Sequence, residues 1–588
     1  MPSGTSLFRS LNARLGDSQA LPILLISKGS LLAALVCVGF GWDLAAGIAL
    51  IVSTLCEFPL EHRTKALSLL FTQASFGIPV RFTVRILIAL LATSVLDDRA
   101  TRLSLAAGSM LLLAVLCVRV LHTEYRRVGP LKPLRTRGIT GNPHIDDAPP
   151  ANLVLVVGVQ TLVLVVAVAG ASWWAVLAAT LGSALVLAAV TIPSVRASWR
   201  MRMAKRKTGF TQPLQQVQNF INETKPEVIV HLSGPGDAAY QINTWLPALE
   251  ALDRKVLIII RNLELFERVA QTRLPVLGLP SPGELLMLDF ANAKVSLFPA
   301  NTGDNIHVLR LPELMSAFIG HGDSDKSASN NPFSRAYDEL WVAGEAGADR
   351  YRTSNLGIDE SRYRLVGRPQ VDGITQHPKI GESEIPTVLY APTWEGVNPE
   401  QEYSSVRAIG LKLVKQLISD GHVRVIYKPH PFTGQRDPRY RASHADIVRA
   451  LNEAKASSGI DHRVVRSGAI SPWFNEATGL VSDISSVVSD FLASEKPYAV
   501  FDHEDIGAKA FREEYPSSAA ATIISRNGDG IGEFIDVITD RTPDQLAQYR
   551  SKLATYLLGP AEKRTIGSFV AAVEELIARS ESERAQYR

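Results

Sequence analysis

Several short clusters of ionisable and hydroxyl side chains in the second half of the chain could do chemistry together. A histidine can accept a proton, and cations and hydroxyls can bind the oxygens of a phosphate. The clusters are "GHGDSDK" with His321, Asp323 and Lys326; "GRPQVD" with Arg368; "YAPTWEG" with Thr393 and Trp394; "KPHP" with Lys428 and His430; and "SDISSVVSDF" with Asp483, Ser485 and Ser486. These residue types point to proton transfer at a histidine and to binding of a phosphate-containing group.

The serine-rich cluster has two interpretations. Ser485 and Ser486 stand where a helix is expected to begin, and a serine there ordinarily caps the first-turn amides. Free first-turn amides also attract anions, and two hydroxyls can donate to phosphate oxygens. With Lys428 and His430 at a neighbouring strand end, we expect a site for a diphosphate.

His321 also has an ordinary interpretation and a functional one. A histidine after an apolar run is often only packed or exposed. Gly320 and Gly322 on either side allow a tight turn and close approach by a substrate. A largely neutral imidazole could accept the proton of an attacking hydroxyl, and Asp323 could orient the ring.

Alternating strand-like and helix-like segments must position these clusters. The strands expected in the first half are "EVIVHLSG", "KVLIIIRN", "AKVSLFPA", "NIHVLRL", "SAFIGHGD", "ELWVAG" and "YRLVGRPQ". After a hydrophilic break, "TVLYAPTW", "VRVIYKPHP", "HRVV", "GLVSDI" and "YAVFD" continue the pattern. This order predicts two α/β lobes with doubly wound, Rossmann-like parallel sheets, over 226–375 and 386–588, the second ending in a closing helix. Ligands bind at the carboxyl ends of such strands, where the clusters fall.

The first 195 residues of the 588 are rich in Leu, Val and Ala and predict an all-α membrane domain of about six spanning helices. The net charge of only +3 says little about partners, and no nucleic acid is expected among them. The expected spans are Leu21–Trp42, Leu44–Leu60, Phe82–Leu96, Leu103–Leu121, Ala151–Gly170 and Ser172–Ile192.

Lys and Arg concentrate in alternate loops, which predicts that both ends of this domain and the lobes lie in the cytoplasm at a cell membrane. The linker 196–225 begins with "RASWRMRMAKRK". This basic run is either only a topology signal or a contact with anionic lipid.

The motifs "HG", "GRPQVD", "YAPTWEG", "KPHP" and "SDISSVVSDFLASEKPYAVFD" resemble those of the CDP-glycerol glycerophosphotransferases, the primases and polymerases of teichoic acid synthesis. The resemblance covers most of the chain from Val228 to about Asp502. It implies a two-lobed fold of the GT-B type and transfer of glycerol phosphate, or a similar alcohol phosphate, from CDP-glycerol to a hydroxyl of a lipid-linked acceptor, with release of CMP.

The resemblance also implies roles for individual residues. It makes His321 the general base, while His430, Ser485 and Ser486 bind the diphosphate. Lys428 and Arg368 would offset its charge, and Arg368 could instead pair with Asp372. No cofactor is called for, although a divalent cation is compatible with the chemistry. Two alternatives stay open: a GT-B glycosyltransferase that uses a nucleotide sugar, and a membrane scaffold that binds nucleotide or polymer without turnover.

Overall fold

The computed structural model describes residues 20–63, 78–95, 98–128, 132–145, 153–169, 172–208, 210–311, 314–322, 331–354, 356–376, 385–396 and 402–586. Contacts within the chain divide it into two units. Unit 1 runs to Leu134 and includes His144–Gln215, whereas unit 2 consists of Arg135–Pro143 and everything from Gln216 onward.

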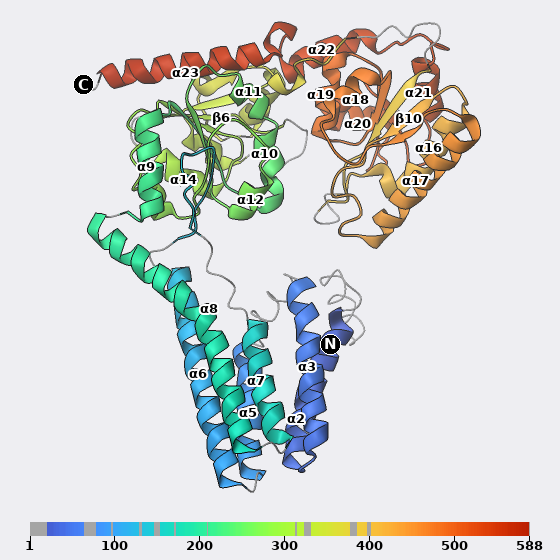
Figure 1. The fold of residues 1–588 in the computed structure, drawn as a ribbon. Coiled ribbons are helices and arrows are strands. Elements are labelled where there is room, and N and C mark those ends of the chain that lie inside the picture. The colour runs from blue at the N-terminus through green and yellow to red at the C-terminus, as the bar shows by residue number, and fades with distance from the viewer. Residues whose placement is uncertain are drawn as a thin grey trace. The chain divides into compact units, whose positions relative to one another are not determined.

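Unit 1 is built from long apolar helices, and each expected span coincides with one of them (Figure 1). The helices are α2 (Ala20–Gly39), α3 (Asp43–Arg63), α5 (Ile78–Val95), α6 (Arg99–Val128), α7 (Leu153–Val168) and α8 (Trp173–Thr208). Leu31, Ala34, Leu50, Ile88 and Leu164 form part of their common core. The helical character expected for these runs is therefore confirmed.

The expectation of about six membrane spans is not supported, because among the described residues one helix passes as a candidate. Only Trp173–Arg200, within α8, is long and apolar enough over its described length to cross a bilayer, which takes about 20 residues. Shorter apolar stretches lie at Ile26–Gly39, Asp43–Cys56, Val84–Ser94 and Gly158–Ala167. Arg85 lies inside α5, fully buried, with Nη2 3.3 Å from Thr54 Oγ1.

The first sheet of unit 2 has eight strands in the order β1-β4-β3-β2-β5-β6-β7-β8. All neighbouring pairs are parallel except β1 and β4, which are antiparallel. The strands are β1 (Arg135–Arg137), β2 (Val228–Leu232), β3 (Val256–Ile260), β4 (Val276–Gly278), β5 (Val295–Phe298), β6 (Met315–Phe318), β7 (Glu339–Val342) and β8 (Tyr363–Leu365). The strands β1 and β4 were not predicted from the sequence.

Helices between these strands make the crossovers that a parallel sheet requires. They are α9 (Gln212–Thr224), α10 (Tyr240–Asn243), α11 (Leu246–Glu250), α12 (Leu263–Arg268), α13 (Pro282–Leu285), α14 (Ile306–Leu309) and α15 (Glu345–Thr353). The strand expected at "NIHVLRL" is wrong, because α14 occupies it. A short apolar run cannot be assigned by periodicity alone, and here Val308 is buried, His307 is partly exposed and Arg310 is exposed, as on a helix turn.

The second sheet has six parallel strands in the order β11-β10-β9-β12-β13-β14. They are β9 (Thr387–Ala391), β10 (Arg424–Tyr427), β11 (Arg463–Val464), β12 (Gly479–Ser482), β13 (Tyr498–Phe501) and β14 (Thr522–Ile524). The α/β fold with two parallel sheets is thus confirmed.

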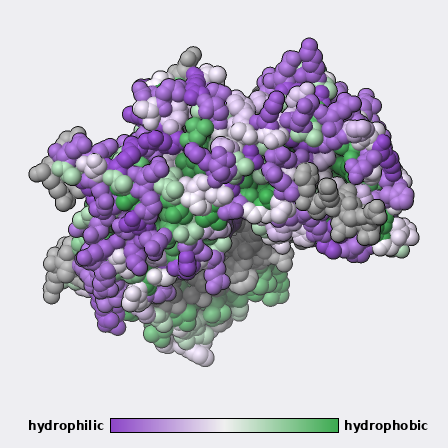
Figure 2. Space-filling view, turned by 90° about the horizontal axis from the view of Figure 1, so that it is seen from above, coloured by the Kyte–Doolittle hydropathy of each residue, from purple (hydrophilic) through white to green (hydrophobic). Residues whose placement is uncertain are grey.

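Helices on both faces of the second sheet bury its apolar strands. They are α16 (Leu411–Ser419), α17 (Pro438–Ser458), α18 (Ser471–Glu476), α19 (Ser486–Phe491), α20 (Ala508–Glu514), α21 (Ile531–Ile538) and α22 (Ala547–Leu558). The last helix, α23 (Ile566–Gln586), instead packs Phe569, Val573 and Leu576 into the core of the first sheet (Figure 1). In the space-filling view, hydrophilic side chains cover most of the visible face (Figure 2).

Candidate functional site

Three of the predicted clusters follow three adjacent strands of the second sheet. Strand β9 lies between β10 and β12, and Tyr390 is paired with both Tyr427 and Val481. The residues after β9, β10 and β12 therefore share one edge of the sheet, since parallel strands end on the same side. This edge carries Thr393, Lys428 and Ser485.

A buried carboxylate ties two of these loops together. Asp483, fully buried after β12, accepts the backbone N–H of Thr393 at 2.9 Å and that of Ser405 at 3.1 Å. The carbonyl oxygen of Thr393 in turn accepts the Ser404 hydroxyl at 2.8 Å. Asp483 and Thr393, both predicted to contact substrate, thus shape the loops on this edge through internal hydrogen bonds.

Glu395 holds the loop that follows "KPHP". Its buried carboxylate accepts the backbone N–H groups of Gly434 at 3.0 Å, Arg436 at 3.0 Å and Asp437 at 3.4 Å. Hydrogen bonds to an ionised acceptor are stronger than those between neutral groups. Glu395 therefore fixes the position of this loop relative to β9.

His430 is held in one orientation with a defined tautomer. The backbone N–H of Phe432 donates to its Nδ1 at 3.1 Å, so in the neutral ring the proton is on Nε2. The ring of Trp394 is stacked on the imidazole, with centroids 6.0 Å apart and an interplanar angle of 20°. Arg436 covers Trp394 at 5.5 Å from the ring centroid. Nε2 of His430 is consequently a hydrogen-bond donor suited to a phosphate oxygen.

Lys428 is only half exposed and is partly engaged by the protein. Its ammonium donates to the carbonyl oxygens of Ser467 at 3.3 Å and Gly468 at 3.0 Å, in the loop after β11. Burial lowers the pKa of this ammonium. Two of its three protons are thus used by carbonyl oxygens, which leaves one donor and the positive charge.

Ser485 and Ser486 begin α19, but Ser485 does not cap it. The Ser485 hydroxyl donates to the carbonyl oxygen of Asp483 at 3.1 Å, and its side chain accepts no first-turn amide. Both serine side chains are partly exposed. The capping interpretation is therefore not what the structure shows at Ser485.

His321 follows β6 in the first sheet and is oriented by a backbone carbonyl. A carbonyl oxygen can only accept, so the 2.9 Å contact with Pro299 places a proton on Nδ1. The side-chain nitrogen of Gln241 donates to the other ring nitrogen, Nε2, at 3.4 Å. Trp245 holds the turn through a 2.6 Å bond from its indole N–H to the Gly320 carbonyl. His321 thus presents Nε2 as the basic atom.

The turn that carries His321 lies against α19 of the second lobe. A Cβ built on Gly322 would be 3.4 Å from the Cβ of Ser486 and 3.7 Å from an Nη atom of Arg368. Gly322 itself is exposed. The structure therefore brings His321, Arg368 and Ser486 to one place.

Arg368 binds Asp490, and not the Asp372 that the sequence offered as its partner. Its Nε is 2.8 Å from Asp490 Oδ1 and its Nη2 is 3.3 Å from Oδ2. Asp372 instead accepts the backbone N–H of Ile566 at 2.8 Å. Because the guanidinium of Arg368 is already paired with the Asp490 carboxylate, its charge is largely used within the protein. Its main effect is to hold α19 in position, and it contributes less to balancing the charge of a diphosphate.

Asp323 and Lys326 lie outside the described residues, so the structure says nothing of their expected roles. In the part of the chain that is described, no cluster of three or more His, Cys, Asp or Glu side chains is arranged to hold a metal ion.

Sequence reasoning missed Asp490, Glu395 and Gln241. Asp490 could have been found, because it lies four residues after Ser486 and so on the same face of a helix. Glu395 directly follows Trp394 and is an ionisable residue at the end of a buried strand. No sequence pattern pointed to Gln241, because its contact with His321 depends on how two turns far apart in the sequence pack together.

Comparison with known families identifies part of the chain. Residues 332–564 match the family described as CDP-Glycerol:Poly(glycerophosphate) glycerophosphotransferase. This segment is less than half of the chain and contains Arg368, Lys428, His430 and Ser485, whereas His321 precedes it. A search of the curated proteins found no match to this chain.

Solved structures with a similar arrangement were also found. The wall teichoic acid polymerase TagF is 14% identical, covers 67% of this chain and 99% of its own, and has a TM-score of 0.38. The UDP-GlcNAc 2-epimerase of Methanocaldococcus jannaschii is 13% identical, with 59% and 99% covered and a TM-score of 0.40. A putative UDP-N-acetylglucosamine 2-epimerase from Listeria monocytogenes is 11% identical, with 59% and 96% covered and a TM-score of 0.38.

Proposed function

We propose, on the premise that residues 332–564 form a CDP-glycerol glycerophosphotransferase domain, that the chain moves glycerol phosphate from CDP-glycerol to a hydroxyl of a lipid-linked acceptor. The product belongs to a polymer of the teichoic acid type, and CMP is released. The two lobes, assigned to 226–375 and 386–588, act as a GT-B pair. A similar alcohol phosphate would be handled by the same chemistry.

One observation carries this proposal. Gly322, the neighbour of His321, lies against Ser486 and Arg368. A base from the first lobe and a hydroxyl-bearing helix start from the second therefore meet where a phosphate could be attacked. Neither feature alone would indicate group transfer.

The reaction follows from these contacts. The acceptor hydroxyl gives its proton to Nε2 of His321 as its oxygen bonds to the β-phosphorus of CDP-glycerol. The bond from that phosphorus to the CMP oxygen breaks, and CMP leaves with the electron pair. His430 Nε2–H, the Lys428 charge and the Ser486 hydroxyl stabilise the negative charge on the phosphates, and the Ser485 hydroxyl joins them when it turns from the Asp483 carbonyl to the phosphate.

Unit 1 is proposed to be a multi-pass membrane domain, with the lobes on the cytoplasmic side. Large apolar side chains on its helices are highly exposed, among them Leu32 at 63%, Leu44 at 80% and Leu185 at 70%. Exposed apolar surface of this extent favours contact with lipid. The basic run after Ile192 would then lie beside the anionic lipid surface.

The deciding assay incubates membranes that contain the protein with labelled CDP-glycerol and a lipid acceptor. Release of CMP with transfer of label to the lipid fraction supports the proposal. Release of a nucleoside diphosphate from a nucleotide sugar would replace it with glycosyl transfer. Binding of CDP-glycerol without turnover would instead identify a scaffold.

A further inference from the structure

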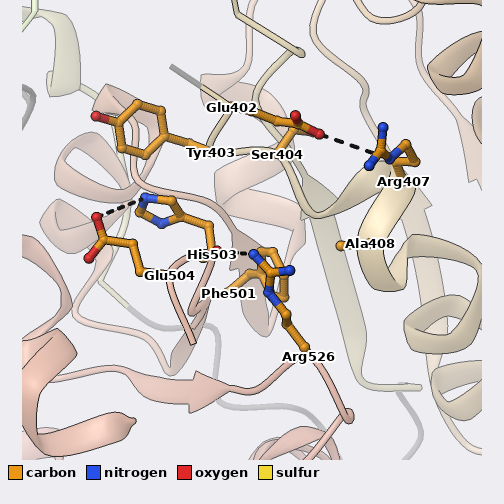
Figure 3. Close-up of a pocket in the computed structure, with 9 residues that line it drawn as sticks. All are labelled: Glu402, Tyr403, Ser404, Arg407, Ala408, Phe501, His503, Glu504 and Arg526. Atoms are coloured by element: carbon orange, nitrogen blue, oxygen red, sulfur yellow. Dashed lines mark hydrogen bonds and ion pairs between the residues drawn. The ribbon is translucent and has the colours of Figure 1, made fainter. Parts of the chain in front are cut away.

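A cavity lies on the same edge of the second sheet, beyond the cluster around Asp483. It has a volume of about 620 Å³, within the usual range for small-molecule sites. Its walls come from the loop that leads into α16, from the residues after β13 and from Arg526 after β14 (Figure 3). Nothing in the proposed reaction uses it.

The cavity is next to the candidate site without being part of it. Ser404 lines it, and the Ser404 hydroxyl donates to the carbonyl oxygen of Thr393. The next residue, Ser405, donates its N–H to Asp483. A ligand in the cavity would therefore lie two hydrogen bonds away from the serines of α19.

Two arginines supply positive charge. Arg526 is exposed and donates to the carbonyl oxygen of His503 at 2.6 Å. Arg407 is 3.9 Å from Glu402, a loose pair that leaves most of its N–H donors available. Figure 3 shows the guanidinium of Arg407 beside Glu402 and that of Arg526 beside the His503 carbonyl. This arrangement favours an anion, and a guanidinium matches phosphate geometry.

Carboxylates and aromatic rings complete the lining. One oxygen of Glu402 accepts the Tyr440 hydroxyl at 2.7 Å, and one oxygen of Glu504 accepts the Tyr515 hydroxyl at 2.9 Å. The second oxygen of each carboxylate can accept from a ligand hydroxyl. Only Ala408 and Phe501 provide aliphatic or phenyl surface, so a lipid chain would fit poorly.

The backbone at this wall has an uncommon conformation. Residues Val406–Gly410, which include Arg407 and Ala408, form a π-helix. Short π-helical segments are rare and occur frequently at functional sites. Arg407 and Ala408 are both exposed on this segment and both line the cavity.

We propose that this cavity binds a phosphodiester unit of the polyol phosphate chain that accepts the transferred group. Arg407 and Arg526 contact the phosphodiester, while Glu402 and Glu504 accept hydrogen bonds from polyol hydroxyls. The identity of the chain rests on the proposed function. The cavity would hold a unit already added while the terminal hydroxyl reaches His321.

The test measures binding to the purified full chain by calorimetry, with glycerophosphoglycerol as the phosphodiester probe. We expect Arg526→Gln and Arg407→Gln each to weaken its binding at least about tenfold. Ala408→Trp, which fills the cavity but keeps both charges, should abolish binding. Arg449→Gln is the matched control, because Arg449 is an exposed arginine of α17 paired with Asp446.

CDP-glycerol binding, measured in parallel, should change less than about twofold in every variant. The proposal would be overturned if the protein did not bind glycerophosphoglycerol. It would also be overturned if all three substitutions left this binding unchanged in folded protein. Equal binding of inorganic phosphate would also overturn it, since the cavity would then be a site for free phosphate. If the protein bound glycerophosphoglycerol in the cavity but released no CMP, the proposed transfer reaction would be rejected and the cavity proposal would stand.

Discussion

Arg368, which follows the last strand of the first sheet, forms a two-point ion pair with Asp490 of α19 beside the second sheet, although 122 residues separate them in the sequence. The side chains are 8% and 19% exposed, so both charges are largely withdrawn from water. Because Arg368 also lies beside Gly322, the pair holds α19 against the turn that carries His321. The geometry of the candidate site therefore depends on this contact.

Asp490→Ala should destabilise unit 2 by about 3 kcal/mol, since it leaves a buried guanidinium without its carboxylate. Activity should fall as well, because α19 loses its attachment to the first lobe. Thermal unfolding and CMP release measure the two effects.

The matched control is Asp446→Ala, which breaks the exposed Arg449–Asp446 pair. That change should cost less than about 1 kcal/mol. Equal effects of the two substitutions would show that the Arg368–Asp490 pair has no special role.

His321→Ala should lower kcat by roughly a hundredfold or more while the protein stays folded, as expected for loss of a general base. His422→Ala, at an exposed loop position, is the control and should retain the normal rate. A normal rate in folded His321→Ala would exclude this residue as the base.

Glu395→Gln should raise KM for CDP-glycerol about tenfold, the equivalent of about 1.4 kcal/mol, with a smaller effect on kcat. A neutral amide accepts the N–H groups of Gly434 and Arg436 less strongly than a carboxylate does, so the loop after His430 loses its fixed position. Steady-state kinetics with varied CDP-glycerol measure both constants. Glu453→Gln, on the exposed face of α17, should leave both unchanged.

His231 should make the stability of unit 2 dependent on pH in the acid range. Burial in β2 lowers the pKa of this imidazole from 6.5 to about 3. Between these values the unfolded chain binds a proton that the folded chain does not, so stability falls as the pH falls below 6.5. By about pH 5 the loss should reach roughly 2 kcal/mol.

The check compares thermal unfolding of the native protein and His231→Gln at several pH values. The Gln side chain cannot titrate but can still donate to Asn305, the present partner of His231 Nδ1 at 3.1 Å. The variant should lack this part of the acid sensitivity. Parallel curves for the two proteins would show that His231 does not carry it.

The sequence by itself determined the local elements and the places where chemistry could occur. Parallel strands are buried on both faces, so they stand out as apolar runs such as "VLIII" and "TVLYA", and the clusters around His430 and Ser485 follow such runs. A ligand edge could be predicted because parallel strands end on the same side. The helical character of unit 1 could be predicted in the same way from its long apolar stretches.

Only the tertiary structure decided which side chains bind one another. Arg368 had Asp372 nearby in sequence and pairs with Asp490 instead, and Asp483 binds backbone amides, although the sequence suggested a substrate contact. The carbonyl of Pro299 sets the tautomer of His321, and Glu395 orders the loop beyond His430. Such partners are chosen by the packing of segments far apart in the chain, and hydrophobic periodicity carries no information about that packing.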